Sequence, residues 1–126
     1  MLTRDPDIMK SASDLIAEAK HRIKEISPRD AVALHQKQDD TVFVDVREPN
    51  EYNLGHVPGA VFIPRGTLEG QIEQRVPRDK RIVLYCAGGN RSALAADTLA
   101  QMGYSRVESL AEGWRGWVNA GGTSES

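Results

Sequence analysis

The chain has 126 residues, enough for one domain with its own core and too few for two ordinary ones. Its 40% hydrophobic and 27% charged residues and its net charge of −2 are typical of a globular protein. The sequence has no basic patch that would bind nucleic acid and no apolar run long enough to span a membrane. With Cys86 as its one cysteine, it excludes an intrachain disulfide and a CxxC zinc or redox motif.

We expect residues 1–22 to form an N-terminal extension that carries an amphipathic helix. In this stretch Leu15, Ile16 and Ala19 follow a serine N-cap at helical spacing, in line with Ile23. The stripe predicts a helix packed on the domain, although a dimer contact or a docking site for a partner would use it equally well. The oligomeric state therefore stays open. Because the N-terminus lacks the apolar run of a secretory signal, we expect a cytoplasmic protein.

Strand and helix patterns alternate through the rest of the chain. Strands are expected at 23–26, 41–46, 60–64, 81–86 and 105–110, and helices at 27–36, 48–55, 68–76 and 91–103, before a last tryptophan-bearing turn of helix. Because these connections are too long for hairpins, the sequence predicts an α/β fold, with an open parallel central sheet of about five strands and helices on both faces. We expect this domain over 23–118 and a flexible tail over 119–126.

One loop combines the cysteine with groups that bind anions. Cys86 ends the most apolar strand, a glycine pair follows, and Arg91 and Ser92 come at the start of a helix. The glycines let backbone N–H groups turn inward and the helix adds its positive end, so we expect a lowered thiol pKa. Ser92 is expected to cap the helix and to point its hydroxyl at the sulfur. A lone cysteine at a strand end is often inert, but here the glycines and the arginine favour a nucleophile that holds an anionic group.

Three segments resemble the rhodanese family of sulfurtransferases in its single-domain form. They are FVDVREPNEYNLGHVPGAVFIP, YCAGGNRS and LAEGWRGW, and the likeness extends over roughly residues 23–118. The resemblance implies that Cys86 is the catalytic nucleophile, which takes a sulfane sulfur as a persulfide from a small anionic donor such as thiosulfate. It also implies that cyanide, glutathione or a protein thiol accepts this sulfur, with no cofactor and no metal.

The residues around the cysteine gain expected roles. Those expected to bind the donor and the persulfide are Arg91, Arg47, Ala87, Gly88, Gly89, Asn90 and Ser92. Arg91 would hold the sulfonate of the donor or, equally, fix the shape of the loop. Arg47 would bind anionic donors or form a structural pair with a carboxylate such as Asp45. Asp45 is expected to anchor backbone groups near the loop. Trp114 would cover the core or wall the mouth of the site, and His56 would be structural.

Three other functions compete with a sulfurtransferase. A persulfide carrier or sensor charged by a protein donor would use the same loop. A catalytically silent binding domain would be expected to lose the cysteine. Cysteine-type phosphatases, and enzymes that act on arsenate in the same way, have one residue more between cysteine and arginine than the four of this chain, 87–90. The phosphatases also commonly have histidine where this chain has Tyr85.

Overall fold

The structure of the chain, a computed structural model, describes residues 9–126, so residues 1–8 of the predicted extension lie outside the described residues. Its elements are α1 (Ala12–Arg22), β1 (Lys24–Ile26), α2 (Pro28–Gln36), β2 (Val42–Asp45), α3 (Pro49–Leu54), β3 (Val61–Phe62), the 3₁₀ turn η2 (Arg65–Thr67), α4 (Leu68–Arg75), β4 (Ile82–Tyr85), α5 (Asn90–Gln101), β5 (Val107–Leu110) and α6 (Gly113–Asn119). Each predicted strand and helix is present, and η2 is the element that the sequence patterns did not predict.

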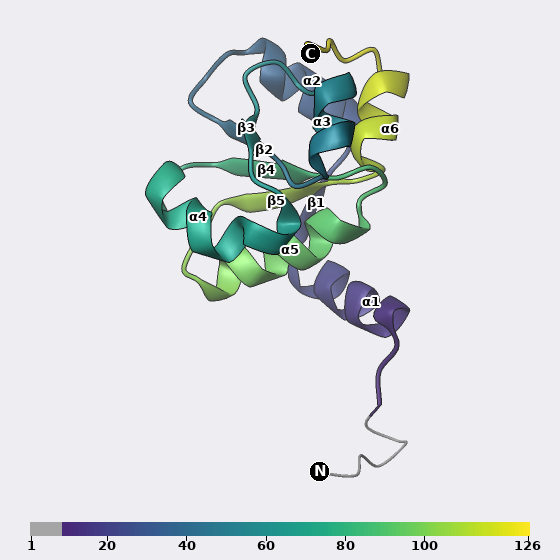
Figure 1. Cartoon of the computed structure of the whole chain (residues 1–126), viewed down its shortest axis with the longest axis vertical. Helices are drawn as coiled ribbons and strands as arrows, with labels where there is room; N and C mark the ends of the chain where they lie inside the picture. Colours follow the sequence, from purple (N-terminus) through teal and green to yellow (C-terminus); the bar gives the residue numbers. More distant parts are fainter. Residues whose placement is uncertain (1–8) are drawn as a thin grey trace.

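The five strands form one parallel sheet in the order β1-β5-β4-β2-β3. All four residues of β4 are buried because the strand lies in the middle of the sheet and both of its faces are covered. Helices α1, α4 and α5 lie on one side of the sheet, and α2, α3 and α6 lie on the other (Figure 1). This arrangement confirms the predicted α/β fold with an open parallel sheet and helices on both faces.

Each face of the sheet has its own hydrophobic core. Leu84 of β4 packs in the core that contains Leu99 of α5, whereas its neighbour Val83 packs in the core that contains Trp117 of α6. This division follows from the strand geometry, because successive side chains of a strand point to opposite faces. Cys86, directly after β4, belongs to the core on the α5 side.

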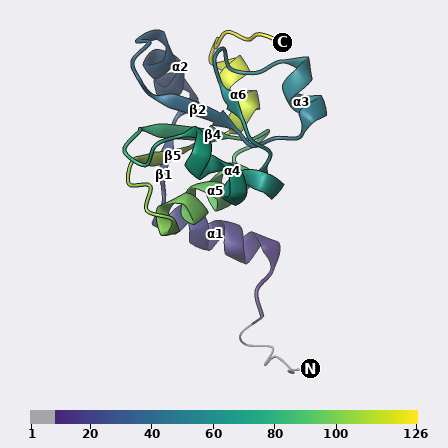
Figure 2. The same cartoon turned by 60° about the vertical axis from the view of Figure 1, so that its left-hand side comes forward.

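Helix α1 is amphipathic, as predicted, and packs against α5. The Ser11 hydroxyl accepts the Asp14 N–H at 3.1 Å, and the Asp14 carboxylate accepts the Ser11 N–H at 2.9 Å, which is a capping box. Arg22 donates to Asp97 of α5 at 3.0 and 2.7 Å. Of the predicted stripe, Ala19 is fully buried, whereas Leu15 is 49% exposed. Figure 2 shows α1 beneath α5, on the side of the molecule away from α3 and α6.

The C-terminal tail, which the sequence analysis expects to be flexible, forms hydrogen bonds with the domain. Glu125 and His56 exchange two backbone hydrogen bonds of 2.9 and 3.0 Å in an isolated antiparallel bridge. Oε1 of Glu125 also accepts the Gly59 N–H at 2.9 Å, and the Thr123 carbonyl accepts the indole N–H of Trp117 at 2.8 Å. The sequence GGTSES carries no strand pattern, and the bridge itself is made by backbone groups, so the composition of the tail could not reveal it.

Candidate active site around Cys86

The candidate site lies at the carboxyl end of the central strand β4. Cys86 directly follows this strand, and a short loop leads into α5, which begins at Asn90. Gly89 is the N-cap residue and has a positive φ of 102°, a conformation that glycine adopts without strain. Since the helix begins one residue before the predicted start, Ser92 lies inside its first turn and does not cap it.

Hydrogen-bond donors surround the sulfur of Cys86. Sγ accepts the backbone N–H groups of Gly89 at 3.1 Å and Ser92 at 3.4 Å, and it lies 3.5 Å from the Ser92 hydroxyl oxygen. That hydroxyl is also 2.8 Å from the hydroxyl of Ser109 on β5. The inward-turned backbone expected from the glycine pair is therefore present at Gly89, and we call the donors around Sγ, from Gly89 and Ser92, the sulfur cradle.

Burial and hydrogen bonding act on the pKa of the Cys86 thiol in opposite directions. Burial disfavours the thiolate and by itself raises the pKa, since the residue is only 1% exposed. Hydrogen bonds from the Ser92 hydroxyl and from the N–H groups of Ser92, Gly89 and Gly88 favour the thiolate and outweigh burial. The pKa of the thiol is therefore lowered, as expected for a nucleophile.

Backbone N–H groups at the start of α6 donate hydrogen bonds to the cysteine loop. The Trp114 N–H donates to the Cys86 carbonyl at 2.8 Å, and the Arg115 N–H donates to the Ala87 carbonyl at 3.3 Å. Gly113 has a φ of 53°, and a Cβ there would come within 2.8 Å of the Ala87 carbonyl oxygen, so only glycine allows this approach. The segment LAEGWRGW therefore contributes backbone donors to the loop, a role that the sequence analysis missed.

Arg91 contacts a carboxylate on α3. Its two terminal nitrogens donate to the two carboxylate oxygens of Glu51 at 3.1 and 3.2 Å. Glu51 is held in turn by the Glu48 N–H at 3.0 Å. The hydrogen bond from Arg91 lowers the pKa of Glu51, which keeps this carboxylate charged at neutral pH. Of the two roles expected for Arg91, fixing the shape of the site is the one that these contacts describe.

Arg47 and Asp45 form a buried pair, with side chains 3% and 0% exposed. Arg47 donates to Asp45 through Nη2 at 2.8 Å and to the Gly55 carbonyl at 2.7 Å, and its guanidinium lies 4.9 Å from the centre of the Trp114 ring. Of the two roles expected for Arg47, the structural pair with a carboxylate is the one that these contacts describe, since Nε and Nη2 are both engaged inside the protein. Asp45 accepts the Arg47 backbone N–H at 2.9 Å, so the backbone group that it anchors is the one at Arg47.

The other predicted residues lie around the loop. Ala87 is half-buried and Gly88 is exposed, and the exposed Asn90 is the first residue of α5. Trp114 is half-buried and packs on the core that contains Trp117, so it covers that core. The expectation for His56 agrees with its contacts, since its ring lies 3.7 Å from the Tyr52 ring in a stack and Nδ1 donates to the Tyr52 carbonyl at 3.0 Å.

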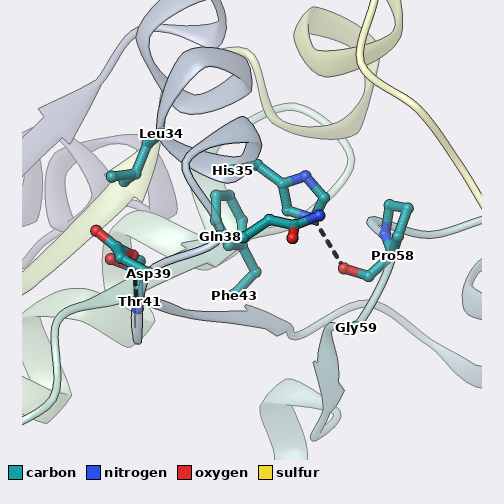
Figure 3. Close-up of a pocket in the computed structure, with 8 residues that line it drawn as sticks. All are labelled: Leu34, His35, Gln38, Asp39, Thr41, Phe43, Pro58 and Gly59. Carbon is teal, nitrogen blue, oxygen red and sulfur yellow. Dashed lines mark hydrogen bonds between the residues drawn. The ribbon is translucent and has the colours of Figure 1, made fainter.

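A surface hollow lies beside α2, away from the cysteine loop. Its volume is about 290 Å³, and it is lined by Leu34, His35, Gln38, Asp39, Thr41, Phe43, Pro58 and Gly59 (Figure 3). His35 donates from Nε2 to the Pro58 carbonyl at 2.9 Å and packs edge-on against Phe43 and Trp117, so it serves the packing here. Within residues 9–126, no three His, Cys, Asp or Glu residues gather as metal ligands would, and no helix is long and apolar enough to cross a membrane.

Two curated relatives of the chain have names that refer to sulfur. A sulfurtransferase of Allochromatium vinosum is 35% identical over 95 residues, which are 73% of this chain and 88% of the relative. A Bacillus subtilis protein named "Putative sulfur carrier protein YrkF" is 37% identical over 75 residues, which are 60% of this chain. The chain spans only 40% of the length of that relative and 58% of the uncharacterized protein YqhL of the same organism.

Solved structures share the fold along most of the chain. A protein of unknown function from Rhodopseudomonas palustris, with the description "Possible Tyrosine Phosphatase", superposes with a TM-score of 0.86 and 36% identity over 99% of this chain and 100% of that one. A thiosulfate sulfurtransferase from Pseudomonas aeruginosa superposes with a TM-score of 0.73 and 35% sequence identity. The match covers 81% of this chain and 20% of that one. The family model described as "Rhodanese-like domain" matches residues 27–120. Because this match takes in strands β2 to β5 and the Cys86 loop, the chain belongs to the rhodanese-like domain family.

Proposed function

We propose that this protein is a sulfurtransferase that carries a sulfane sulfur on Cys86. Its family and its sulfurtransferase relative support a role in sulfur transfer. The observation that carries the proposal is the sulfur cradle, in which Sγ accepts N–H groups at 3.1 and 3.4 Å and the pKa of the thiol is lowered. A thiolate in such a cradle is a ready nucleophile, and the same donors would stabilise the negative charge of a terminal persulfide sulfur.

The proposed reaction consists of two displacements. The Cys86 thiolate attacks the outer sulfur of thiosulfate, the S–S bond of the donor breaks, and its electron pair leaves with sulfite. Cys86 then carries a persulfide. Cyanide or a thiolate attacks the terminal sulfur, and the Cys86 thiolate leaves with the electron pair, so the reaction needs no added oxidant or reductant. Because the chain has no second cysteine, the accepting group comes from another molecule, such as glutathione or a protein thiol.

A second candidate is a persulfide carrier that a protein donor charges. The likeness to the Bacillus subtilis relative with a sulfur-carrier name favours it. The pairing of Arg91 with Glu51 favours it too, because a paired arginine attracts a free dianion such as thiosulfate less strongly. Such a carrier would turn over thiosulfate slowly and take sulfur quickly from a cysteine desulfurase. Both functions agree with the cytoplasmic location predicted from the sequence.

The mass of the intact protein distinguishes these functions. After thiosulfate, we expect the chain to gain one sulfur atom, which cyanide then removes, and we expect Cys86→Ser to gain none. A gain that requires a cysteine desulfurase and its substrate cysteine would assign the carrier function. If neither donor adds sulfur, and Cys86-dependent hydrolysis of p-nitrophenyl phosphate appears, the phosphatase alternative replaces both. The four-residue spacing between Cys86 and Arg91 argues against that result.

A further inference from the structure

Three arginines lie around the Cys86 loop, and they differ in their partners. Arg47 is buried against Asp45, and Arg91 is paired with Glu51. The third, Arg115 on α6, is exposed and forms no ion pair with any carboxylate of residues 9–126. Its guanidinium is therefore the cation near the loop that a ligand can contact without displacing a protein carboxylate.

The Arg115 side chain lies directly against the loop. Its Nε is 3.5 Å from the Ala87 carbonyl oxygen, and a Cβ on Gly88 would come within 2.8 Å of its Nη2. Gly88 is the neighbour of Gly89, whose N–H donates to the Cys86 sulfur at 3.1 Å. The guanidinium thus lies against the residue next to the cradle.

A surface hollow opens beside this guanidinium. Its volume is about 310 Å³, and it is lined by Gly88, Glu112, Arg115, Gly116 and Asn119. The lining brings together the guanidinium and the Asn119 amide, both hydrogen-bond donors, with one carboxylate, that of Glu112.

We infer that Arg115 and this hollow bind the oxyanion end of the sulfur donor while its sulfane sulfur reaches Cys86. The inference rests on the proposed function. Two parallel N–H groups of a guanidinium match two oxygens of a sulfonate, which is why arginine suits this ligand. Arg91 cannot offer the same pair of donors without first releasing Glu51. The carboxylate of Glu112 lines the same hollow and weakens the attraction of Arg115 for an anion. Charge alone would therefore hold the donor weakly, and the contact of its sulfane sulfur with Cys86 would add to the binding.

Thiosulfate binding to the full-length Cys86→Ser chain tests this subsite without any sulfur transfer. The probe is the Gly88 amide resonance, followed by NMR as thiosulfate is added. In the Cys86→Ser chain, the further substitution Arg115→Gln should raise the dissociation constant for thiosulfate about fivefold, which is the effect of losing one exposed charged contact. Arg115→Lys keeps the charge and should lose less of the affinity. The matched control is Arg106→Gln, an exposed arginine just before β5 that donates to the Asp79 carbonyl, and it should leave the constant unchanged.

An equal dissociation constant with and without Arg115→Gln overturns the inference, and so does an absence of saturable binding to the Cys86→Ser chain. A second measurement uses the native cysteine and the rate of persulfide formation from thiosulfate. This rate should fall about fivefold in Arg115→Gln, whereas discharge of a preformed persulfide by cyanide should not change. If thiosulfate binding depends on Arg115 but the native chain never gains sulfur, the anion subsite stands and the sulfurtransferase proposal fails.

Discussion

The Cys86 thiolate depends on hydrogen-bond donors more than on a neighbouring cation. Arg91 gives its two terminal nitrogens to Glu51, whereas Ser92 presents both its N–H and its hydroxyl to the sulfur. The Ser92 hydroxyl is the largest of the influences that lower the pKa of the thiol against the effect of burial. Ser92 is therefore the residue whose loss should change the acidity of Cys86 most.

Replacing Ser92 with alanine should raise the pKa of the Cys86 thiol. The thiolate is the reacting form, so the rate is full above this pKa and falls as the pH drops through it. The inflection in the pH profile of persulfide formation should therefore move to higher pH, and the rate at neutral pH should fall. Ser109→Ala is the control, because it removes the partner of the Ser92 hydroxyl but no donor to the sulfur. An unchanged inflection in Ser92→Ala would contradict this account.

Glu51 limits the charge that Arg91 offers to an anion. Glu51→Gln keeps the size of the side chain and removes its negative charge, so kcat/KM for thiosulfate should rise about fivefold. Steady-state kinetics with thiosulfate and cyanide measure the change. Glu69→Gln, which alters an exposed carboxylate paired with Arg65, is the matched control and should have no effect. A lower kcat/KM in Glu51→Gln would mean that Glu51 positions Arg91 and does not mask it.

Helix α1 is connected to the site through α5, the helix that begins at the cysteine loop. The two helices are joined by the Arg22–Asp97 ion pair at 2.7 Å and by packing around the fully buried Ala19. Since α1 lies on the far side of α5 from α3 and α6, we expect it to affect stability and not chemistry (Figure 2).

Ala19→Leu tests this role of α1. The added methyl and methylene groups have no space at a fully buried position, so the free energy of unfolding should fall by about 1–3 kcal/mol. Urea denaturation measures the loss. Ala17→Leu places the same side chain at an exposed position of the same helix and should change the stability by less than about 0.5 kcal/mol. Equal effects of the two substitutions would show that α1 is not packed against the domain in solution.

For the molecule as a whole, the tail bridge links the C-terminus to the segment after α3. Removing residues 123–126 deletes the bridge to His56 and the acceptor of the Trp117 indole N–H. A buried donor left without a partner costs about 1–3 kcal/mol, so the free energy of unfolding should fall by that amount. Urea denaturation checks it, and removal of Ser126 alone is the control. The shortened chain should still turn over thiosulfate at low temperature, where it stays folded. An unchanged free energy of unfolding would contradict a structural role for the tail.

Most of the fold could be predicted because each element carries a local signal. Ser27 followed by proline starts α2, and the unbroken apolar run of β4 indicates a strand covered on both faces. The cradle was predictable for the same reason, since the glycines stand two and three positions after Cys86 in the sequence. The partner of Arg91 was not, because Glu51 is 40 positions away and meets it only once α3 is packed. The antiparallel tail bridge at Glu125 escaped prediction likewise, as a contact between distant backbone groups.

The support that α6 gives to the cysteine loop also has a consequence for protein synthesis. A nascent chain leaves the ribosome from its N-terminus, so Cys86 emerges well before Gly113 and Trp114. Until these residues dock, the carbonyls of Cys86 and Ala87 lack their donors and the loop is not held in its final shape. We therefore expect the thiol to keep an ordinary acidity between the synthesis of Cys86 and the docking of α6. It becomes a strong nucleophile only when the sheet and helices that bury it are complete.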